Sequence, residues 1–574
     1  MEDLSRLVRG YALKNAVEHG GKAVVGSVVS MIMSDRPDLR PRAREIARIA
    51  AVIVEEVNSM RVEDQRRILE EEYPEIARPK RPSVEQVERG LPPLPHARAG
   101  NVVTRFAPNP DFAMHIGNAR PAILSYEYSR MYKGRMILRF EDTDPRTKTP
   151  LLEAYDMIRE DLRWLGVRWD EEHVQSLRME VFYEAAREAL ERGCAYVDIC
   201  GEAGRSLLRE GRYCRTRDNG PEWQLDEFDK MLSGVYGEKE AVVRVKTDPT
   251  HPNPSLRDWV ALRIIDTSKT PHPLVGDKYI VWPTYNFAVT VDDHSMGVTH
   301  VIRAKEHEVN TEKQLFLYRC LGWEPPQFIH IGRLKLEGFI LSKSFIRRIM
   351  SENPGKFWGF DDPRFGTIAG LRRRGITPEA IREVILSLGV KHTEATLSWP
   401  NLASVNRKIL DSKSDRIMFV EKPRAFRLQM DKCREALVPV HPDRRETRSY
   451  RLCPGDVVYM DSSDVKDGSK VRLLGLDNFT IDEKGSSLEL LGGGVEYARK
   501  ASIPIVHWVP SPDATRVKVL KPRGLELEEV TGLAEPAIKG YSEGSTLQFV
   551  RYGFVRVDRT GKAGDPVTVI YTHE

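Results

Sequence analysis

The sequence predicts a multidomain protein that joins an α/β fold to helical and all-β parts. First, residues 101–148 alternate strand, helix and strand patterns. Second, apolar residues recur at helical spacing before residue 97. Third, short strand-like runs separated by Gly, Asp and Pro turns dominate from Ile417 onward. With 574 residues, the chain is also too long for a single hydrophobic core.

A strand–helix–strand unit near residue 100 organises the rest of the chain. VVTRF at residues 102–106 is typical of a buried strand, which the prolines of APNP at 107–110 end. A helix is expected at residues 119–132, and MILRF at 136–140 predicts a second strand. The loop and helix N-terminus of such a βαβ unit bind phosphate groups, because free N–H groups and the helix dipole favour an anion.

A set of short motifs then indicates a family. RFAPNP at residues 105–110, HIG at 115–117 and RFEDTD at 139–144 occur in this order, and LSKS follows at 341–344. Each motif alone is weak, but together they resemble the class I aminoacyl-tRNA synthetases. The best match is the glutamyl/glutaminyl subgroup. The extra helices before the core are similar to those of glutamyl-tRNA synthetases of the archaeal and eukaryotic type.

The resemblance implies a class I Rossmann-like catalytic domain that is split by an insertion for the tRNA acceptor end. It also implies a helical region that contacts the tRNA stem and a β-barrel region that binds the anticodon. We therefore expect six parts: an N-terminal helical module with its linker (1–97), the first catalytic half (98–198), the acceptor-end insertion (199–275), the second catalytic half with a lysine loop (276–348), the stem-contact region (349–416) and the β barrels (417–574).

The resemblance also implies the reaction. It is the ATP-dependent ligation of L-glutamate to the 3′ end of tRNA(Glu) through a glutamyl adenylate, with Mg²⁺ accompanying ATP. A second candidate substrate is tRNA(Gln), and the N-terminal module is a candidate site for a protein partner. Neither step needs a protein nucleophile. The site must instead position the reactants and neutralise charge that builds on phosphate oxygens.

Two groups of residues match the positions of the family's site. The expected catalytic residues are His115 and Lys343, and the further expected ATP contacts are Gly117, Asn118, Ser342 and Ser344. The expected glutamate contacts are Arg105, Ala107, Glu141, Tyr285 and Arg303. Arg303 matches a position that faces the side-chain carboxylate, where glutaminyl relatives have an uncharged residue. A buried arginine at that position would favour a carboxylate over an amide.

The sequence departs from the family pattern at three places. Asn118 replaces the usual histidine of HIGH and cannot carry a charge. DFA at residues 111–113 replaces a glycine-bearing loop, and Val289 stands where bacterial glutamyl enzymes have a polar group. Two alternatives therefore stay open. One is a glutaminyl-tRNA synthetase, against which Arg303 argues; the other is a catalytically silent tRNA-binding scaffold, for which Asn118 is the only support.

Composition indicates a cytoplasmic protein. The net charge of +4 permits a nucleic-acid partner through local basic patches but does not require one. No apolar run approaches the length of a membrane span, so we expect no membrane contact. The six cysteines form no regular framework, which fits a reducing cytosol. At Cys200 and Cys214 we favour free thiols over zinc and expect no metal site, because zinc needs three or four N/S ligands at close spacing.

Overall fold

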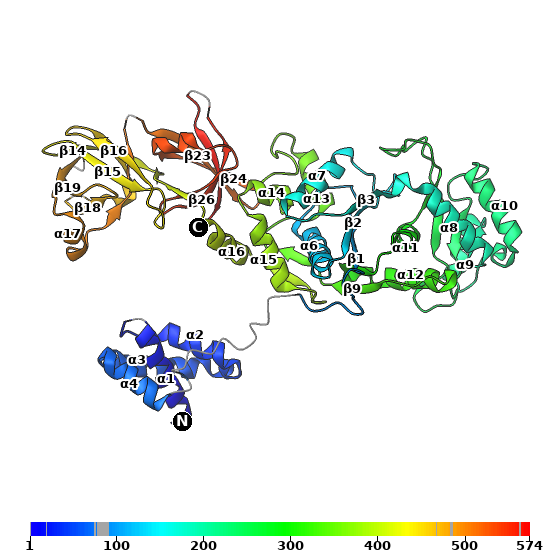
Figure 1. The fold of residues 1–574 in the computed structure, drawn as a ribbon, viewed down its shortest axis with the longest axis horizontal. Coiled ribbons are helices and arrows are strands. Elements are labelled where there is room, and N and C mark those ends of the chain that lie inside the picture. The colour runs from blue at the N-terminus through cyan, green and yellow to red at the C-terminus, as the bar shows by residue number, and fades with distance from the viewer. Residues whose placement is uncertain are drawn as a thin grey trace. The chain divides into compact units, whose positions relative to one another are not determined.

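The computed structural model describes residues 2–18, 20–73, 76, 91–466, 468–482, 486–511, 513–561 and 564–574. The chain divides into two compact units, Met1–Gly90 and Leu91–Glu574. The linker expected at residues 79–82 lies outside the described residues. Figure 1 shows the helical first unit in blue and the α/β and β parts of the second unit in cyan to red.

The first unit is helical, as predicted. Along its third helix, Ile46, Ala50, Val54 and Val57 are buried, so an apolar stripe of helical period faces the core of the unit. The buried amide of Gln65 donates to the carbonyl of Val57 and ties two helices together. The helices are α1 (Glu2–Glu18), α2 (Val25–Asp35), α3 (Ala43–Asn58) and α4 (Val62–Glu72).

The second unit contains a five-stranded parallel sheet in the order β3-β2-β1-β8-β9. The strand order reverses between β1 and β8, and ligands of open α/β sheets bind at the carboxyl ends of the strands beside such a point. The predicted βαβ unit is therefore present and holds the centre of the sheet (Figure 1). The strands are β1 (Val103–Phe106), β2 (Arg135–Phe140), β3 (Glu171–Val174), β8 (His300–Ala304) and β9 (Gln327–Ile331).

Four helices connect these strands. The helix after β1 starts three residues earlier than predicted, at Ile116, because His115 and Asn118 cap it; Pro121 does not break it. Its buried face packs with β2 and with later helices in one hydrophobic core, which includes Ile123, Leu138 and Ile381. The helices are α6 (Ile116–Met131), α7 (Leu152–Trp164), α11 (Tyr285–Ser295) and α12 (Glu308–Leu321).

The segment between β3 and α11 forms an antiparallel sheet in the order β4-β5-β6-β7. Its core continues into the second half of the parallel sheet, since Val243 and Trp282 pack in one cluster with Phe287 of α11 and Leu317 of α12. The elements are α8 (Met179–Glu191), β4 (Ala195–Asp198), α9 (Gly201–Arg209), α10 (Pro221–Leu232), β5 (Val242–Val245), β6 (Val260–Ile264) and β7 (Val281–Pro283).

A mainly helical stretch follows β9. Two short strands, β10 (Leu334–Leu336) and β11 (Ala395–Leu397), pair in parallel and join both ends of this stretch. Its helices are α13 (Lys343–Glu352), α14 (Ile368–Arg373), α15 (Pro378–Leu388) and α16 (Trp399–Asp411). Within the described ranges of the chain, none of the helices is both long and apolar enough to cross a lipid bilayer.

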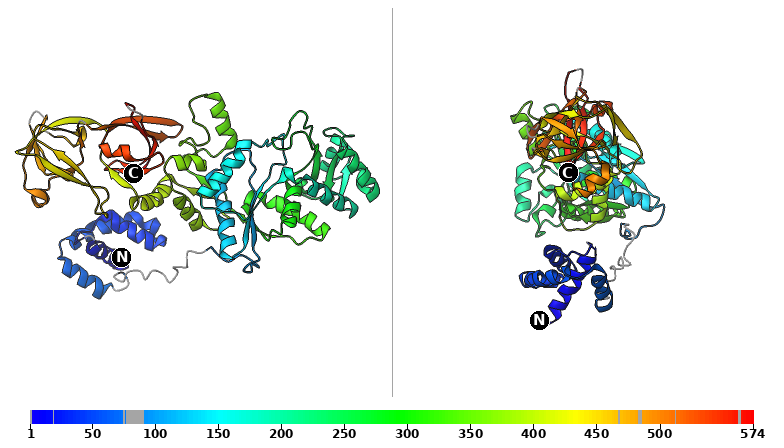
Figure 2. Two further views of the ribbon diagram at one scale, coloured as in Figure 1. Left: turned by 45° about the horizontal axis from the view of Figure 1, so that its top comes forward. Right: turned by 90° about the vertical axis from the view of Figure 1, so that its left-hand side faces the viewer.

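The C-terminal region consists of two seven-stranded sheets, which confirms the predicted β barrels. One sheet has the order β12-β25-β26-β27-β23-β24-β13, and its two edge strands are consecutive in the chain. The left view in Figure 2 shows these strands curling into a ring. The strands are β12 (Asp415–Ile417), β13 (Phe419–Val420), β23 (Thr515–Arg523), β24 (Glu526–Ala534), β25 (Thr546–Phe549), β26 (Gly553–Arg559) and β27 (Val567–His573).

The other sheet is inserted into the first, because its strands lie between β13 and β23 in the chain. Its order is β21-β18-β19-β20-β14-β17-β22. The edge strands are again consecutive, and Phe426, Val458 and Trp508 are buried in its own core. The elements are β14 (Pro423–Gln429), the hairpin β15 (Arg434–Pro439) and β16 (Thr447–Leu452), β17 (Val457–Asp461), β18 (Lys470–Leu473), β19 (Asn478–Ile481), β20 (Ser487–Leu490), α17 (Gly494–Lys500), β21 (Ile505–Val506) and β22 (Val509–Pro510).

The prediction of free cysteines is wrong. All six cysteines form disulfides: Cys194–Cys320, Cys200–Cys214 and Cys433–Cys453. The cysteine spacing did not specify the pairing, since one pair joins cysteines 126 residues apart and the other two join cysteines 14 and 20 residues apart. Disulfides are rare in reducing compartments, with intracellular proteins of hyperthermophiles as the exception.

We predict that the disulfide with the longer chain segment between its cysteines stabilises the protein more. A cross-link restricts the unfolded chain, and the expected effect is about 5 kcal/mol for Cys194–Cys320 and about 3 kcal/mol for Cys433–Cys453. Replacing both cysteines of the first pair by alanine should therefore lower the melting temperature more than the same change in the second pair. Thermal melts without reductant measure this difference, and alkylation of free thiols in the native protein would contradict the pairing itself.

Candidate active site

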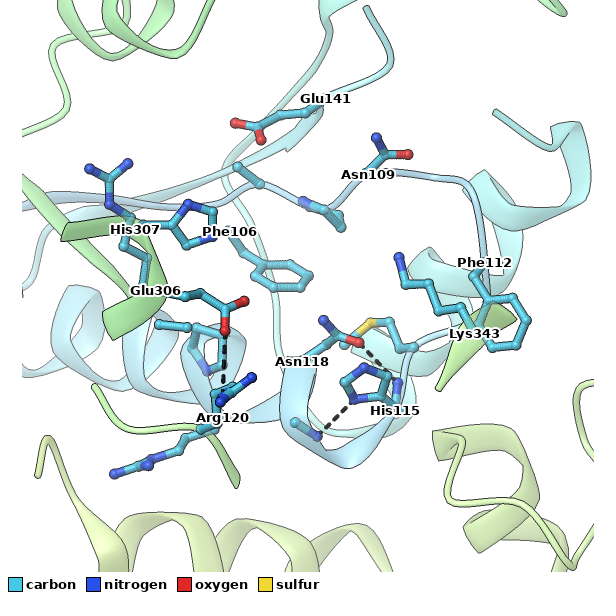
Figure 3. Close-up of a pocket in the computed structure, with 18 of the residues that line it drawn as sticks. Phe106, Asn109, Phe112, His115, Asn118, Arg120, Glu141, Glu306, His307 and Lys343 are labelled. Carbon is cyan, nitrogen blue, oxygen red and sulfur yellow. Dashed lines mark hydrogen bonds and ion pairs between the residues drawn. The ribbon is translucent and has the colours of Figure 1, made fainter. Parts of the chain in front are cut away.

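A cavity of about 1080 Å³ opens at the carboxyl edge of the parallel sheet. Residues from both halves of the sheet, from β10 and from the start of α13 line it. Figure 3 shows Lys343, His115 and Asn118 at one end, and Glu141 and His307 toward the other. The expected site residues that line the cavity are Arg105, Ala107, His115, Gly117, Asn118, Glu141, Tyr285, Arg303, Ser342 and Lys343. Ser344 does not line it, because the chain has already turned into α13.

His115 is held as a neutral hydrogen-bond donor at the N-terminus of α6. Its Nδ1 accepts from the N–H of Gly117 at 3.1 Å, so the ring proton is on Nε2. Burial lowers the pKa of His115 to about 4, and positive Lys343 adds to this effect. A Cβ on Gly117 would lie 2.8 Å from the His115 ring and 3.1 Å from the Leu334 carbonyl, so only glycine allows this close packing. The first backbone N–H groups of α6 are already paired: Ile116 donates to the Gly366 carbonyl, and Asn118 and Ala119 donate to the His115 carbonyl. At this helix N-terminus, His115 therefore presents its neutral imidazole Nε2–H to an anion.

The structure shows what Asn118 does at the position where the family pattern has a histidine. Its Oδ1 accepts from the backbone N–H of His115 at 3.2 Å, which completes a reciprocal cap with the His115 side chain. The amide NH₂ group of Asn118 is left for a ligand in the cavity. Asparagine thus fixes the conformation of the His115 backbone and still presents a donor.

Lys343 lies at the first position of α13, with Ser342 as the N-cap. The expected flexible lysine loop is therefore a helix start. The Lys343 ammonium lies 2.6 Å from a carboxylate oxygen of Asp111, and 38% of its side chain is exposed. Lys343 and His115 thus approach the same end of the cavity from different elements.

The opposite end of the cavity rests on a buried ion network. Asp293 of α11 pairs with Arg139 of β2 at 2.7 Å and with Arg105 of β1 at 3.4 Å. Arg139 in turn donates to Glu141 at 3.1 Å. Burial opposes ionisation of Asp293, but Arg139 and Arg105 outweigh it and lower its pKa. Burial raises the pKa of Glu141 despite the same two arginines.

Arg303 is buried beside this network but, within the described ranges, has no carboxylate partner. Only 5% of the residue is exposed. Its Nη2 donates to Thr311 Oγ1 at 2.6 Å and to Gln314 Oε1 at 2.9 Å, and its Nη1 lies 3.5 Å from the Tyr285 hydroxyl. The buried Nε–H has no partner in the described part of the chain. Burial lowers the pKa of Arg303, which marks an uncompensated buried cation.

Two residues of this end were missed by sequence reasoning. Asp293 was given no role, because it lies inside a helix, where nothing in the local sequence marks a functional side chain. His307 lies four residues after Arg303, beyond the strand end that drew attention to the arginine. The His307 Nδ1 lies 3.2 Å from the Tyr285 hydroxyl, and burial, helped by Arg303 and Arg105, lowers the pKa of His307 to about 3.

Comparison with known proteins agrees with this geometry. The catalytic-domain model of "tRNA synthetases class I (E and Q)" matches residues 101–412. Two anticodon-binding-domain models of the same family match residues 414–492 and 505–558. The first boundary falls just before β12, and the second falls within the inserted sheet, around α17 and before β21.

Proteins named glutamate–tRNA ligase are similar over the whole chain. That of Aeropyrum pernix is 61% identical and covers 100% of both chains. That of Hyperthermus butylicus is 52% identical over 98% of this chain and 100% of its own, and that of Pyrobaculum calidifontis is 52% identical over 98% of both. The family predicted from the motifs is confirmed: the chain belongs to the class I tRNA synthetases of the glutamate and glutamine group.

Proposed function

We propose that the protein is a glutamate–tRNA ligase that works in the cytoplasm. It attaches L-glutamate to the 3′ end of tRNA(Glu) through a glutamyl adenylate, and tRNA(Gln) is a second candidate acceptor. The observation that carries the proposal is Arg303, a buried guanidinium that lines the cavity and has no carboxylate partner among the residues that the structure describes. The names of the relatives that match over the whole chain support the same reaction.

The side-chain carboxylate of glutamate complements Arg303. A carboxylate accepts two hydrogen bonds in parallel and supplies the missing negative charge. The amide of glutamine would leave the cation buried and unpaired and would turn an NH₂ group toward it, at a cost of roughly 3–5 kcal/mol. Arg303 therefore argues against the glutaminyl alternative.

Glu141 is placed to bind the substrate ammonium. One oxygen of its carboxylate accepts a hydrogen bond from Arg139, and the residue lines the cavity. Burial raises the pKa of this carboxyl group. The ammonium group of a bound glutamate would be a second cation beside Arg139 and would favour the ionised form of Glu141. Ala107 and Tyr285 would form the walls on either side, since both line the cavity.

The other end would bind ATP. The Nε2–H of His115, at the positive end of the α6 dipole, offers a donor to phosphate oxygens from one side, and Lys343 offers a charge from another. Gly117 lines the same end of the cavity and has no side chain to fill it. Asn118 and Ser342 also line this end of the cavity and are further proposed contacts of ATP. Ser344 does not line the cavity, so we no longer propose it as an ATP contact. These groups are fixed before ATP arrives, which is the condition for electrostatic stabilisation of a transition state.

With glutamate and ATP bound at these two ends of the cavity, the reaction would proceed in two steps. In the first step the glutamate α-carboxylate attacks the α-phosphate of ATP, the bond to the β-phosphate oxygen breaks, and pyrophosphate leaves. In the second step a terminal ribose hydroxyl of tRNA attacks the adenylate carbonyl and AMP leaves. The protein contributes orientation and charge neutralisation in both steps.

Magnesium would enter bound to ATP. The structure offers one cluster of three candidate metal ligands among the residues it describes: Asp198, Cys200 and Cys214. This cluster lies in the insertion, and its two sulfurs are joined in a disulfide. The cavity itself has no set of carboxylates arranged for a cation, so phosphate oxygens and water would hold the ion, as Mg²⁺ prefers.

We predict that Arg303→Ala depresses kcat/KM for glutamate at least about a hundredfold, because roughly 3 kcal/mol of ion pairing is lost. The preference for glutamate over glutamine should shrink by a similar factor. Aminoacylation assays with each amino acid measure both effects. Arg319→Ala removes an exposed arginine from α12 and serves as the control. Near wild-type use of glutamate by the Arg303 variant would show that another group selects the substrate.

Lys343→Ala should lower kcat for adenylate formation far more than it raises KM for ATP. The lysine charge would matter most when negative charge builds on the departing pyrophosphate. ATP–pyrophosphate exchange with tRNA present separates the two constants. A change confined to KM would mean that the lysine only binds ground-state ATP, and no exchange by the wild type would favour the silent scaffold.

His115 should stay neutral throughout the physiological range. We expect its ring resonance, assigned by its loss in His115→Asn, to titrate with a midpoint of about 4, whereas a solvated histidine titrates near 6.5. Because the folded form binds fewer protons than the unfolded chain in this window, the stability contribution is fully present above about pH 6.5 and decreases as the pH falls toward 4. A midpoint near 6.5 would place His115 in solvent and remove its role as a neutral donor.

A further inference from the structure

The contact between Asp111 and Lys343 joins two elements that are 232 residues apart in the chain. Asp111 belongs to the DFA segment that departs from the family pattern. Its carboxylate is mostly buried, with 14% of the side chain exposed, and accepts from the Lys343 ammonium at 2.6 Å. Among the described residues, it is the only carboxylate within ion-pairing distance of that lysine.

Lys343 needs such an anion in the absence of ATP. The N-terminus of α13 already carries a partial positive charge from the helix dipole, and a lysine at the first position adds to it. His115, the other nearby titratable group, is neutral and supplies no compensation. Asp111 therefore occupies the role that phosphate oxygens would take in the loaded enzyme.

Apolar packing reinforces this ion pair. Phe112 and Ala113 pack with Ile346 and Ile349 of α13 in one cluster. Arg347, one turn after Lys343, donates to the backbone carbonyl of Asp111 and stacks over the Phe112 ring. The DFA segment and the first turns of α13 thus form one packed body at the mouth of the cavity.

We propose that Asp111 is a positioning residue that holds Lys343 and the start of α13 in place while the site is empty and releases the lysine when the triphosphate arrives. The proposal rests on the assignment of Lys343 to the ATP phosphates. The carboxylate and the triphosphate are both anions and compete for one ammonium, so the lysine exchanges one partner for the other. Because both groups are partly exposed, the pair is weak enough to break.

Hydrogen exchange of the full-length protein tests this exchange of partners. In the empty enzyme, Asp111→Asn should speed exchange of the amides at residues 343–347 by about fivefold, as expected for loss of a partly exposed ion pair. Lys343→Ala should give the same increase, and the double variant no more, because both remove one interaction. With saturating Mg·ATP, protection should return to the wild-type level in Asp111→Asn but not in Lys343→Ala.

Glu352→Gln is the matched control, since it removes one negative charge from the other end of α13, where Glu352 pairs with Arg348 and with no other residue of the described chain. Equal protection of the wild type and Asp111→Asn in the empty enzyme would overturn the proposal. So would protection that stays low in Asp111→Asn with Mg·ATP, because Asp111 would then act through the backbone contact alone. If Mg·ATP restores protection in Lys343→Ala as well, the assignment of Lys343 to the triphosphate fails, whereas the ion pair of the empty enzyme stands.

Discussion

The active-site architecture depends on Asp293, a fully buried carboxylate between two arginines. Arg105 and Arg139 come from the first two strands of the sheet, whereas Asp293 comes from the helix that follows the insertion. The two halves of the fold, more than 150 residues apart, are thus joined by charge at the floor of the cavity. Removing one partner of such a buried network costs about 3–5 kcal/mol, because the remaining charges stay buried. The network also fixes Glu141 through Arg139, so fold stability and the proposed binding of the substrate ammonium depend on the same side chains.

The two ends of the cavity differ in how their charges are held. At the amino-acid end, Asp293, Arg139 and Arg303 are buried in a rigid core, where electrostatic interactions are strong and poorly screened. At the ATP end, Lys343 and Asp111 are partly exposed and lie on a helix start and a loop. Strong fixed charges suit the discrimination of one small substrate from another. Weaker, exchangeable charges suit a group that must bind a triphosphate and then let pyrophosphate go.

Sequence reasoning recovered the fold class and most of the cavity because both follow from local patterns. His115, Glu141 and Arg303 all lie where a strand or a loop meets the carboxyl edge of the sheet, and that position can be read from strand periodicity. Asp293 could not be found in this way, because it lies inside a helix and its role depends on strands far away in the chain. The disulfides were also missed, since cysteine spacing alone does not specify pairing. The insertion of one β sheet into the other was missed because contacts between distant segments leave no local pattern.

In the role that we propose for Arg303, its neutral partners would be needed for selectivity. Arg139 is surrounded by carboxylates, which neutralise it and leave nothing for a substrate to add. Arg303 is instead oriented by a hydroxyl and an amide, from Thr311 and Gln314 of α12. These acceptors fix the direction of the guanidinium without cancelling its charge. A carboxylate in place of the Gln314 amide would neutralise Arg303 and remove the electrostatic advantage of glutamate over glutamine. The proposed preference of Arg303 for an acidic substrate would therefore depend on the arginine and equally on the uncharged groups that hold it.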